Sequence, residues 1–424
     1  MSNSIIRKRI IAMTLGVLLM ILAMGTLIAC GKKDAGIPYS AIMANNDDTA
    51  NGAVAAMEGN ANKIPIYGID ASTKGQQNVN DGKQAGTVEQ QQKLMAQALV
   101  DIIVEWSNNK EQNNYGNDTF LAYKNTQFYA EKNSGKDFSD KDVEVGDAAY
   151  NYKGKDGVVR IPYKPYVPAG TRNIESKEVE KGPNLTNKAL KVVFYVYGAD
   201  DWMTSVQEAV IDYAKDVELT MEAANFNIGD KTESSQATTI TSTIGNYDIA
   251  IINPAGDGGA TQNLKKIADE AKSGAGVPVI FNNKQSTSGE GYDYATNKTV
   301  YVGSDLDGGG DMQGTMLAND LKKGGRFAIQ KEDNSAVKIR VLVLGGEIGH
   351  PDAIYRTFTW IIAAERELKD TGIEIVFEKG VNSKDVKWVQ NYGGSDPWSS
   401  EGAKLAVEQA KTSPGIKLIE EFNK

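Results

Sequence analysis

The sequence predicts an α/β protein with two doubly wound parallel-sheet lobes joined by a hinge. Short, nearly continuous apolar runs alternate along the chain with segments of helical periodicity. Strands that are apolar throughout are typical of parallel sheets whose two faces are covered by helices. A chain of 424 residues also exceeds the usual size of a single hydrophobic core, which favours more than one lobe.

The first series of elements lies before residue 110. A strand, a helix, a strand and a helix are predicted over residues 37–47, 49–60, 63–70 and 90–109. Residues 108 to about 156 are rich in Asn, Asp, Lys and Gly and give no clear prediction. A short strand is predicted over residues 157–163. Residues 164–188, which are charged and interrupted by Pro and Gly, are typical of a linker.

A second series begins near residue 190. Strands are predicted over residues 190–198, 246–254, 277–283, 299–305, 338–346 and 373–378. Helices are predicted between and after them, over residues 203–216, 263–274, 312–323, 352–372 and 399–411. The regular alternation indicates that these segments form parallel sheets with crossover helices.

The charge balance argues against one class of partner. The formal net charge is -9, and the sequence has no basic stripe of the kind that binds phosphates. A nucleic-acid partner is therefore not expected.

The N-terminus has the pattern of a secretory signal. Arg7, Lys8 and Arg9 precede an apolar run over residues 10–29, and small residues precede Cys30. The sequence "LIAC" resembles the bacterial lipoprotein cleavage box, which implies a signal peptide over residues 1–29 and lipidation of Cys30. An uncleaved membrane anchor is the alternative, because the apolar run is about long enough to span a bilayer. Either way the rest of the chain lies outside the cytoplasm. Cys30 is the only cysteine, which excludes an intramolecular disulfide.

Planar polar side chains follow five of the predicted strands. They are Asn45, Asn46 and Asp47; Asp70; Asp200 and Asp201; Asn282 and Asn283; and His350, Asp352 and Arg356. Ligands of doubly wound sheets bind beyond the carboxyl ends of the strands. These side chains are therefore candidates for a shared binding site.

Each candidate also has an ordinary structural alternative. Asn46 and Asp47 could cap the helix that follows them. Asp352 could begin a helix after a proline, and Asp70 could start a turn. His350, the only histidine, could be a structural residue in a tight Gly-His-Pro turn. Taken together, however, the five strand ends favour the ligand site.

The chemistry of the set suits a neutral monosaccharide. Carboxylates, amides, Arg and His donate or accept hydrogen bonds in pairs within a plane, which matches adjacent hydroxyl groups. Trp202 and Trp398 could lie on the apolar faces of a sugar ring. Three acidic groups to one arginine disfavour an anionic ligand. Paired carboxylates could also perform glycoside hydrolysis, but the common catalytic motifs are absent, and an enzyme is not expected.

Several motifs carry a family resemblance. The segments "IMANNDDTANGAV", "IPIYGIDA", "AGTVEQ", "VPVIFNNK", "YVGSD" and "LGGEIGHPDAIYRT" resemble the periplasmic galactose/glucose-binding proteins of bacterial ABC importers. The resemblance extends over nearly all of the chain from about residue 36. It implies the type I periplasmic binding protein fold.

The order of these motifs is rotated relative to that family, which indicates a circular permutant. The resemblance implies a tether over residues 30–36 and a permutation linker over residues 164–188. One lobe, similar to the family's C-terminal lobe, would comprise residues 37–90 and 304–424 with 158–163. The other would comprise residues 91–157 and 189–303. Circular permutation costs a protein little stability when its original termini lie close together.

The resemblance also implies roles for individual residues. Asp200, Asn283, His350, Asp352, Arg356, Asn46 and Asp70 would hydrogen-bond the sugar, and Trp202 and Trp398 would enclose its ring. Gln90 stands where the family commonly has Asn, and its side chain is longer by one methylene. Either Tyr195 or Tyr197 could supply a further hydroxyl. The family's calcium loop is not retained, because Ala336, Lys338 and Arg340 occupy later ligand positions and Ser40 the distant one. No metal or other cofactor is expected.

The expected mechanism is closure of two lobes about three crossings, near "YVGSD", "GTVEQ" and "VVRIPY". The resemblance implies a monomeric, lipid-anchored protein that binds glucose or galactose and delivers it to the permease of an ABC importer. Sugar sensing for a chemoreceptor or membrane kinase is the alternative, since the same residues serve both. A glycoside hydrolase is a third possibility. The sequence does not distinguish glucose from galactose.

Overall fold

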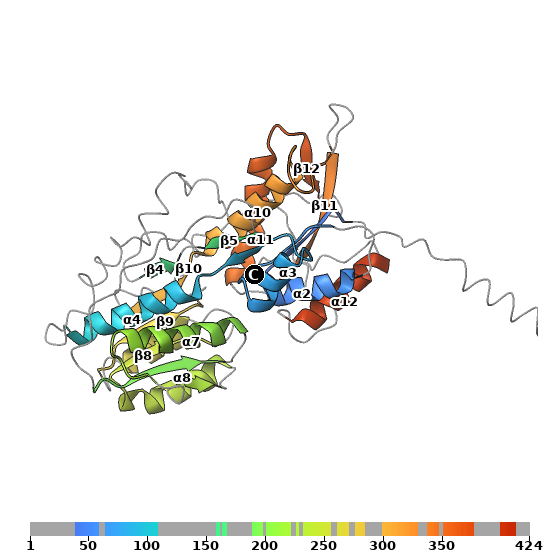
Figure 1. The fold of residues 1–424 in the computed structure, drawn as a ribbon. Coiled ribbons are helices and arrows are strands. Elements are labelled where there is room, and N and C mark those ends of the chain that lie inside the picture. The colour runs from blue at the N-terminus through green and yellow to red at the C-terminus, as the bar shows by residue number, and fades with distance from the viewer. Residues whose placement is uncertain are drawn as a thin grey trace, which may run out of the picture.

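The computed structural model contains two parallel sheets in separate lobes (Figure 1). It describes residues 39–58, 64–108, 158–161, 163–167, 189–197, 201–221, 226–228, 232–255, 261–270, 276–284, 299–329, 337–346, 351–376 and 399–412. Both sheets are covered by helices on both faces, so the predicted α/β class with two parallel-sheet lobes is confirmed.

The smaller lobe is built on a four-stranded sheet. Its order is β12-β11-β1-β2, from Ile373–Val376, Val337–Leu344, Ala41–Ala44 and Ile66–Tyr67. Alternate side chains of β1 face opposite layers. Ile42 packs with helices α2 (Asp47–Met57) and α12 (Ser400–Thr412), and Met43 with α10 (Leu306–Leu321) and α11 (Pro351–Leu368). This double covering explains why β1 is apolar throughout.

The larger lobe is built on a six-stranded parallel sheet. Its order is β4-β10-β9-β8-β6-β7, from Val158–Ile161, Thr299–Ser304, Val279–Asn282, Ile249–Ile252, Val192–Val196 and Phe226–Ile228. The same alternation operates in β6. Phe194 faces helices α4 (Gln92–Asn108) and α7 (Asp201–Asp216), while Tyr195 faces α8 (Glu233–Thr243) and α9 (Thr261–Glu270).

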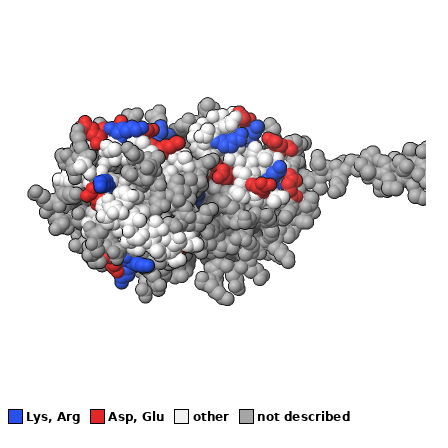
Figure 2. Space-filling model, turned by 90° about the horizontal axis from the view of Figure 1, so that it is seen from below, with Lys and Arg blue, Asp and Glu red and all other residues white. Residues whose placement is uncertain are grey.

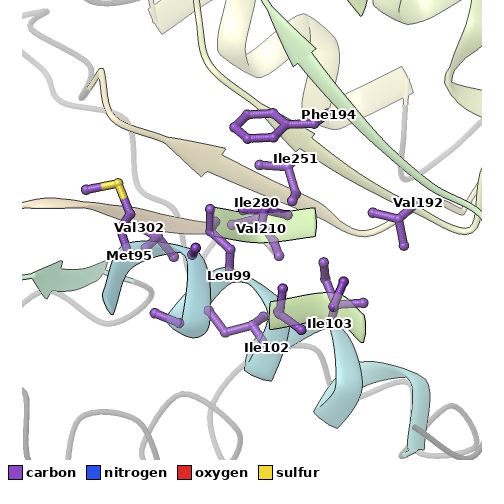
Figure 3. Close-up of a cluster of buried hydrophobic side chains, with 14 of the residues drawn as sticks. Met95, Leu99, Ile102, Ile103, Val192, Phe194, Val210, Ile251, Ile280 and Val302 are labelled. Carbon is purple, nitrogen blue, oxygen red and sulfur yellow. The ribbon is translucent and has the colours of Figure 1, made fainter. Parts of the chain in front are cut away.

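The core beneath the larger sheet depends on a helix from the start of the chain. Figure 3 shows α4 supplying the side chains that lie opposite the strands. Leu99 and Ile103 are fully buried against Ile251, Ile280 and their neighbours. The helical spacing of apolar residues in α4 therefore reflects packing against a sheet whose strands follow much later in the sequence.

The chain passes between the lobes at three neighbouring places. It runs from β3 (Thr87–Glu89) into α4, from β4 into β5 (Lys164–Tyr166), and from β10 into α10. β3 and β5 pair antiparallel beside the smaller lobe. The amide of Asp305 donates to the carbonyl of Ile161 at 2.8 Å, which joins the second and third crossings directly.

Two sequence-based boundaries are corrected by the structure. Strand β4, predicted to accompany the smaller lobe, pairs in parallel with β10 in the six-stranded sheet. Residues 164–166, predicted as part of a linker, form β5, and Val167 is buried in the core of the smaller lobe. Pro162 separates the two strands in the sequence; it has no amide hydrogen for a sheet ladder.

The glycine-rich segment "GGGDMQG" is explained by helix packing. Helix α10 begins at Leu306, earlier than predicted, so Gly310 and Gly314 lie one turn apart within it. A Cβ atom on Gly310 would overlap Thr359 and the backbone of Arg356, and one on Gly314 would overlap the backbone of Trp360. The glycines therefore permit close contact between α10 and α11. Helices α3 (Thr73–Asn80) and α8 and strand β7 were not predicted, since their segments lack apolar periodicity.

Candidate functional site

Arg356 is the centre of a buried polar cluster at the carboxyl end of the smaller sheet. It lies in the first turns of α11 and is 3% exposed. Its Nη1 donates to the carbonyl of Asn45 at 2.8 Å, and its Nη2 donates to Asp352 Oδ2 at 2.9 Å and to the Tyr163 hydroxyl at 3.2 Å. Asp70 Oδ1 lies 3.7 Å from Nη1. The structure thus brings three predicted site residues together.

The electrostatics of this cluster keep Arg356 charged. Burial by itself lowers the pKa of Arg356, but neighbouring Tyr163, Asp352 and Asp70 outweigh it and the net shift is upward. Burial raises the pKa of the Asp352 carboxyl, and the charge of Arg356 is the largest influence in the opposite direction. The guanidinium therefore lies beside two nearly buried carboxylates and favours the ionised form of Asp352 against the effect of burial.

Two further cations lie near Asp352, and the sequence-based charge count missed them. Lys284 and Arg160 both act to lower the pKa of Asp352, although they belong to the larger lobe. Lys284 is 2% exposed, and its Nζ lies 4.1 Å from the ring centroid of Tyr197. The count of three acidic groups to one arginine is therefore incomplete. Lys284 directly follows Asn283 in "FNNK", so its position at a strand end could have identified it as a site residue.

Asp70 and Gln90 are held by a chain of hydrogen bonds. Asp70 has a positive φ of 110° and is 8% exposed. Gln90 Nε2 donates to Asp70 Oδ1, and Gln90 Oε1 accepts from the Ser304 hydroxyl at 2.8 Å. The longer amide of Gln90 therefore spans from the smaller lobe to the end of β10.

Asn46 has the structural role that the sequence left open. Its side chain accepts from the amide of Thr49 at 2.9 Å and completes a capping box at the start of α2. This role uses the side-chain oxygen. The Nδ2 group and the second lone pair of the oxygen could still contact a sugar, and that role stays a prediction.

Asp47 is also a structural residue. Its carboxylate accepts from the Thr87 hydroxyl and the Ser72 amide, both at 2.7 Å, and from Gln84 Nε2 at 3.2 Å. Burial raises the pKa of Asp47 to about 6, although these three hydrogen bonds lower it. The carboxyl connects the start of α2 with the N-cap of α3 and with β3.

In the larger lobe, Asn283 and Asn253 stand at the ends of neighbouring strands. Asn283 has a φ of 66°, and its carbonyl accepts from the Tyr301 hydroxyl at 2.6 Å. Asn253, which the sequence analysis missed, is fully buried after β8, and its side-chain amide has no hydrogen-bond partner among the described residues. Asn253 and Asn282 stand at the ends of their apolar strands in the same way, as "IIN" and "IFN" show, and Asn283 directly follows Asn282.

The aromatic candidates occupy different surroundings. Trp202 is 8% exposed and packs in the core between α7 and α4. The Tyr195 hydroxyl pairs with that of Thr243 at 2.8 Å, and its ring meets Tyr247 edge-on. Tyr195 therefore faces α8. Of the two tyrosines, Tyr197 is the one near the site, because Lys284 lies over its ring and also lowers the pKa of Asp352.

Several predicted features lie outside the described residues. These are Asp200, His350 and Trp398, the signal segment with Cys30, and the residues 331–336 of the altered calcium loop. Among the residues that are described, no group of three or more His, Cys, Asp or Glu side chains could hold a metal ion. No helix within this part of the chain combines the length and the hydropathy needed to cross a membrane.

The described surface carries both signs of charge side by side. Figure 2 shows Lys and Arg interspersed with Asp and Glu toward the outer parts of the visible face, over both lobes. Nucleic-acid backbones favour a continuous basic stripe, and the visible described residues form a mixed pattern.

Comparison with known proteins identifies a family and finds several similar solved structures. A family described as "periplasmic binding protein domain" matches residues 190–421, which is more than half of the chain. Among solved structures, the binding protein of the arabinose ABC transporter from Shewanella sp. ANA-3 is 23% identical, with a TM-score of 0.31 over 44% of this chain and 53% of that one. A ribose ABC transporter protein from Conexibacter woesei is 20% identical, with a TM-score of 0.31 over the same shares.

A third structure is the solute-binding protein from Actinobacillus succinogenes with bound D-allose. It is 16% identical, with a TM-score of 0.33 over 44% of this chain and 57% of that one. The chain spans little more than half the length of these proteins.

Proposed function

The chain belongs to the periplasmic binding protein domain family, and from this premise we propose that it captures a neutral monosaccharide outside the cytoplasm and delivers it to an ABC importer. Proteins of this family bind solutes and are not enzymes. The observation that carries the proposal is that the carboxylates of Asp352 and Asp70 both lie within 4 Å of the Arg356 guanidinium. It lies at the carboxyl end of the sheet, where ligands of such folds bind.

The ligand chemistry follows from the groups on both lobes. Asp70 and Asp352 supply acceptors, and Arg356 supplies donors in a fixed plane. Lys284 and the amides of Asn253 and Asn283 add groups from the larger lobe. A sugar hydroxyl both donates and accepts, so a ring carrying adjacent hydroxyls can pair with this mixed set. D-Glucose and D-galactose are the proposed ligands, on the strength of the "GHPDAIYR" and "ANND" motifs.

The expected result of a calorimetric screen is one-to-one binding of D-glucose, D-galactose or both. D-Ribose, L-arabinose and D-allose serve as the comparison sugars. They differ from glucose and galactose in the ring substituents that the carboxylates and the guanidinium would hydrogen-bond. A sugar lacking one contacted hydroxyl should bind more weakly, since a buried polar group would be left unpaired. If none of these neutral sugars produced binding heat, the proposed function would be wrong.

The rotated order of the chain is part of the proposal. The family match begins at residue 190. Both sheets nevertheless take strands from earlier residues, β1 and β2 in one and β4 in the other. These observations support a circularly permuted relative of the family. A rearranged gene that places residues 39–167 after residue 412 should therefore give a folded protein with the same sugar affinity, measured by calorimetry. Loss of folding would contradict the permutation.

Membrane attachment through lipidated Cys30 is proposed from the "LIAC" sequence. Cells that express the protein should incorporate labelled palmitate into it, and the C30S variant should not be labelled. Equal labelling of both proteins would remove Cys30 as the attachment site.

A further inference from the structure

Ser304 occupies the point where the third crossing leaves the larger lobe. It is the last residue of β10, and α10 of the smaller lobe begins two residues later. Its side chain is 2% exposed. The residue pairs in register with Ile161 of the second crossing. The backbone of Ser304 therefore belongs to the third crossing and pairs with the second.

The hydroxyl of Ser304 reaches the first crossing as well. It donates at 2.8 Å to Oε1 of Gln90, which lies between β3 and α4. The other end of the same amide donates to Asp70. Both ends of the Gln90 side chain are thus fixed, one by a hinge residue and one by a proposed ligand group.

The backbone of Ser304 extends this connection into the larger lobe. Its carbonyl accepts from Arg160 Nη1 at 3.3 Å, and the Arg160 guanidinium lies 5.2 Å from the ring centroid of Tyr301. The Tyr301 hydroxyl in turn holds the carbonyl of Asn283. A continuous set of contacts therefore runs from Asn283 of one lobe, through Ser304, to Asp70 of the other.

We propose that Ser304 is a positioning residue for ligand capture. It orients Gln90 so that the Asp70 carboxylate points at the ligand and the three crossings keep their relative positions. The proposal rests on the proposed sugar-binding function. Without the hydroxyl, the buried Oε1 of Gln90 loses its donor, and the long side chain regains rotamers that turn it away from Asp70.

The expected effect of S304A is a dissociation constant for D-glucose and D-galactose about 10- to 100-fold higher than that of the unaltered chain, mostly through faster release. The control is Y67F, which also removes one hydroxyl from a buried hydrogen bond, at 2.6 Å to Asp320. Asp320 lies near the far end of α10, so Y67F should lower the melting temperature and leave both dissociation constants unchanged.

A double-mutant cycle separates positioning from general stability. If Ser304 acts through Gln90, S304A should weaken binding little further when Q90A is already present. Additive losses from the two substitutions would overturn the proposal. An S304A protein whose dissociation constants lie within twofold of those of the unaltered chain would also overturn the proposal.

A ligand-free measurement keeps the test independent of the proposed function. Spin labels at the exposed positions 242 on α8 and 404 on α12 report the distance between lobes in the C30S chain. S304A should broaden that distance distribution, and Y67F should not. If neither sugar binds the unaltered chain, the proposed function is wrong, while an unchanged distance distribution in S304A overturns the positioning role alone.

Discussion

Replacing Arg356 with Met should lower the free energy of unfolding by about 3–5 kcal/mol and abolish binding of D-glucose and D-galactose. Methionine keeps much of the apolar length of the side chain but removes the guanidinium that lies 2.9 Å from Asp352 and 3.7 Å from Asp70. It also removes the donors to the carbonyl of Asn45 and to the Tyr163 hydroxyl. Urea unfolding and calorimetry measure the two effects.

Arg366 on the same helix provides the matched control. It is 40% exposed, and its ion pairs with Asp311 at 3.0 Å and Glu367 at 3.6 Å lie toward the surface. Water screens such pairs, so R366M should cost roughly 0–1 kcal/mol and leave sugar binding intact. An R356M protein no less stable than R366M would show that the central cluster contributes little to folding.

The contribution of Asp47 to the free energy of unfolding should fall as the pH rises from 4 to 7. The pKa of Asp47 is raised from 3.8 to about 6 in the folded protein. Because the folded pKa is the higher one, the folded state favours the protonated carboxyl. The associated stability is fully present below about pH 4 and is lost as the pH passes through 6. The loss amounts to about 3 kcal/mol at 1.36 kcal/mol for each pKa unit.

The D47N variant isolates this contribution, because an amide does not titrate in this range. Urea unfolding of both proteins between pH 4 and 7.5 should show the stability difference, the unaltered chain minus D47N, falling by that amount. The exposed Asp212, whose carboxylate pairs with Lys215 at 3.0 Å, supplies the control: D212N should change the free energy of unfolding by roughly 0–1 kcal/mol. Parallel profiles for D47N and the unaltered chain would mean that Asp47 does not titrate with a raised pKa.

The fold was predictable because its strands are short, apolar and separated by amphipathic helices. β1, β6, β8 and β9 are buried on both faces, so their sequences contain no polar alternation that could be confused with an exposed sheet. Helix α8 was missed because its residues are mostly hydroxyl-bearing, and only Gln236, Ala237 and Ile240 are buried. Its helical state depends on packing beneath the sheet and on the Thr232 cap.

The candidate site was predictable only in part. Strand ends can be recognised in a sequence, which identified Asp70, Asp352 and Arg356. Lys284, Arg160 and Ser304 were missed because their importance depends on contacts between segments far apart in the chain. Asn46 shows the reverse difficulty: a single residue can cap a helix and stand at a strand end, and its pattern in the sequence is the same for both roles.

The place of β1 in the smaller sheet has a consequence for biogenesis. β1 lies between β2 and β11, and the Arg356 bond to Asn45 joins positions 311 apart. The nascent β1 can therefore pair with β2 early, but its other neighbour, β11, and the Arg356 contact are absent until ribosomes have translated past β11 and α11. Contacts of such long sequence separation slow folding. For a polypeptide that must stay unfolded to pass a secretion channel, this delay would be an advantage, since its leading part cannot complete the sheet of the smaller lobe early.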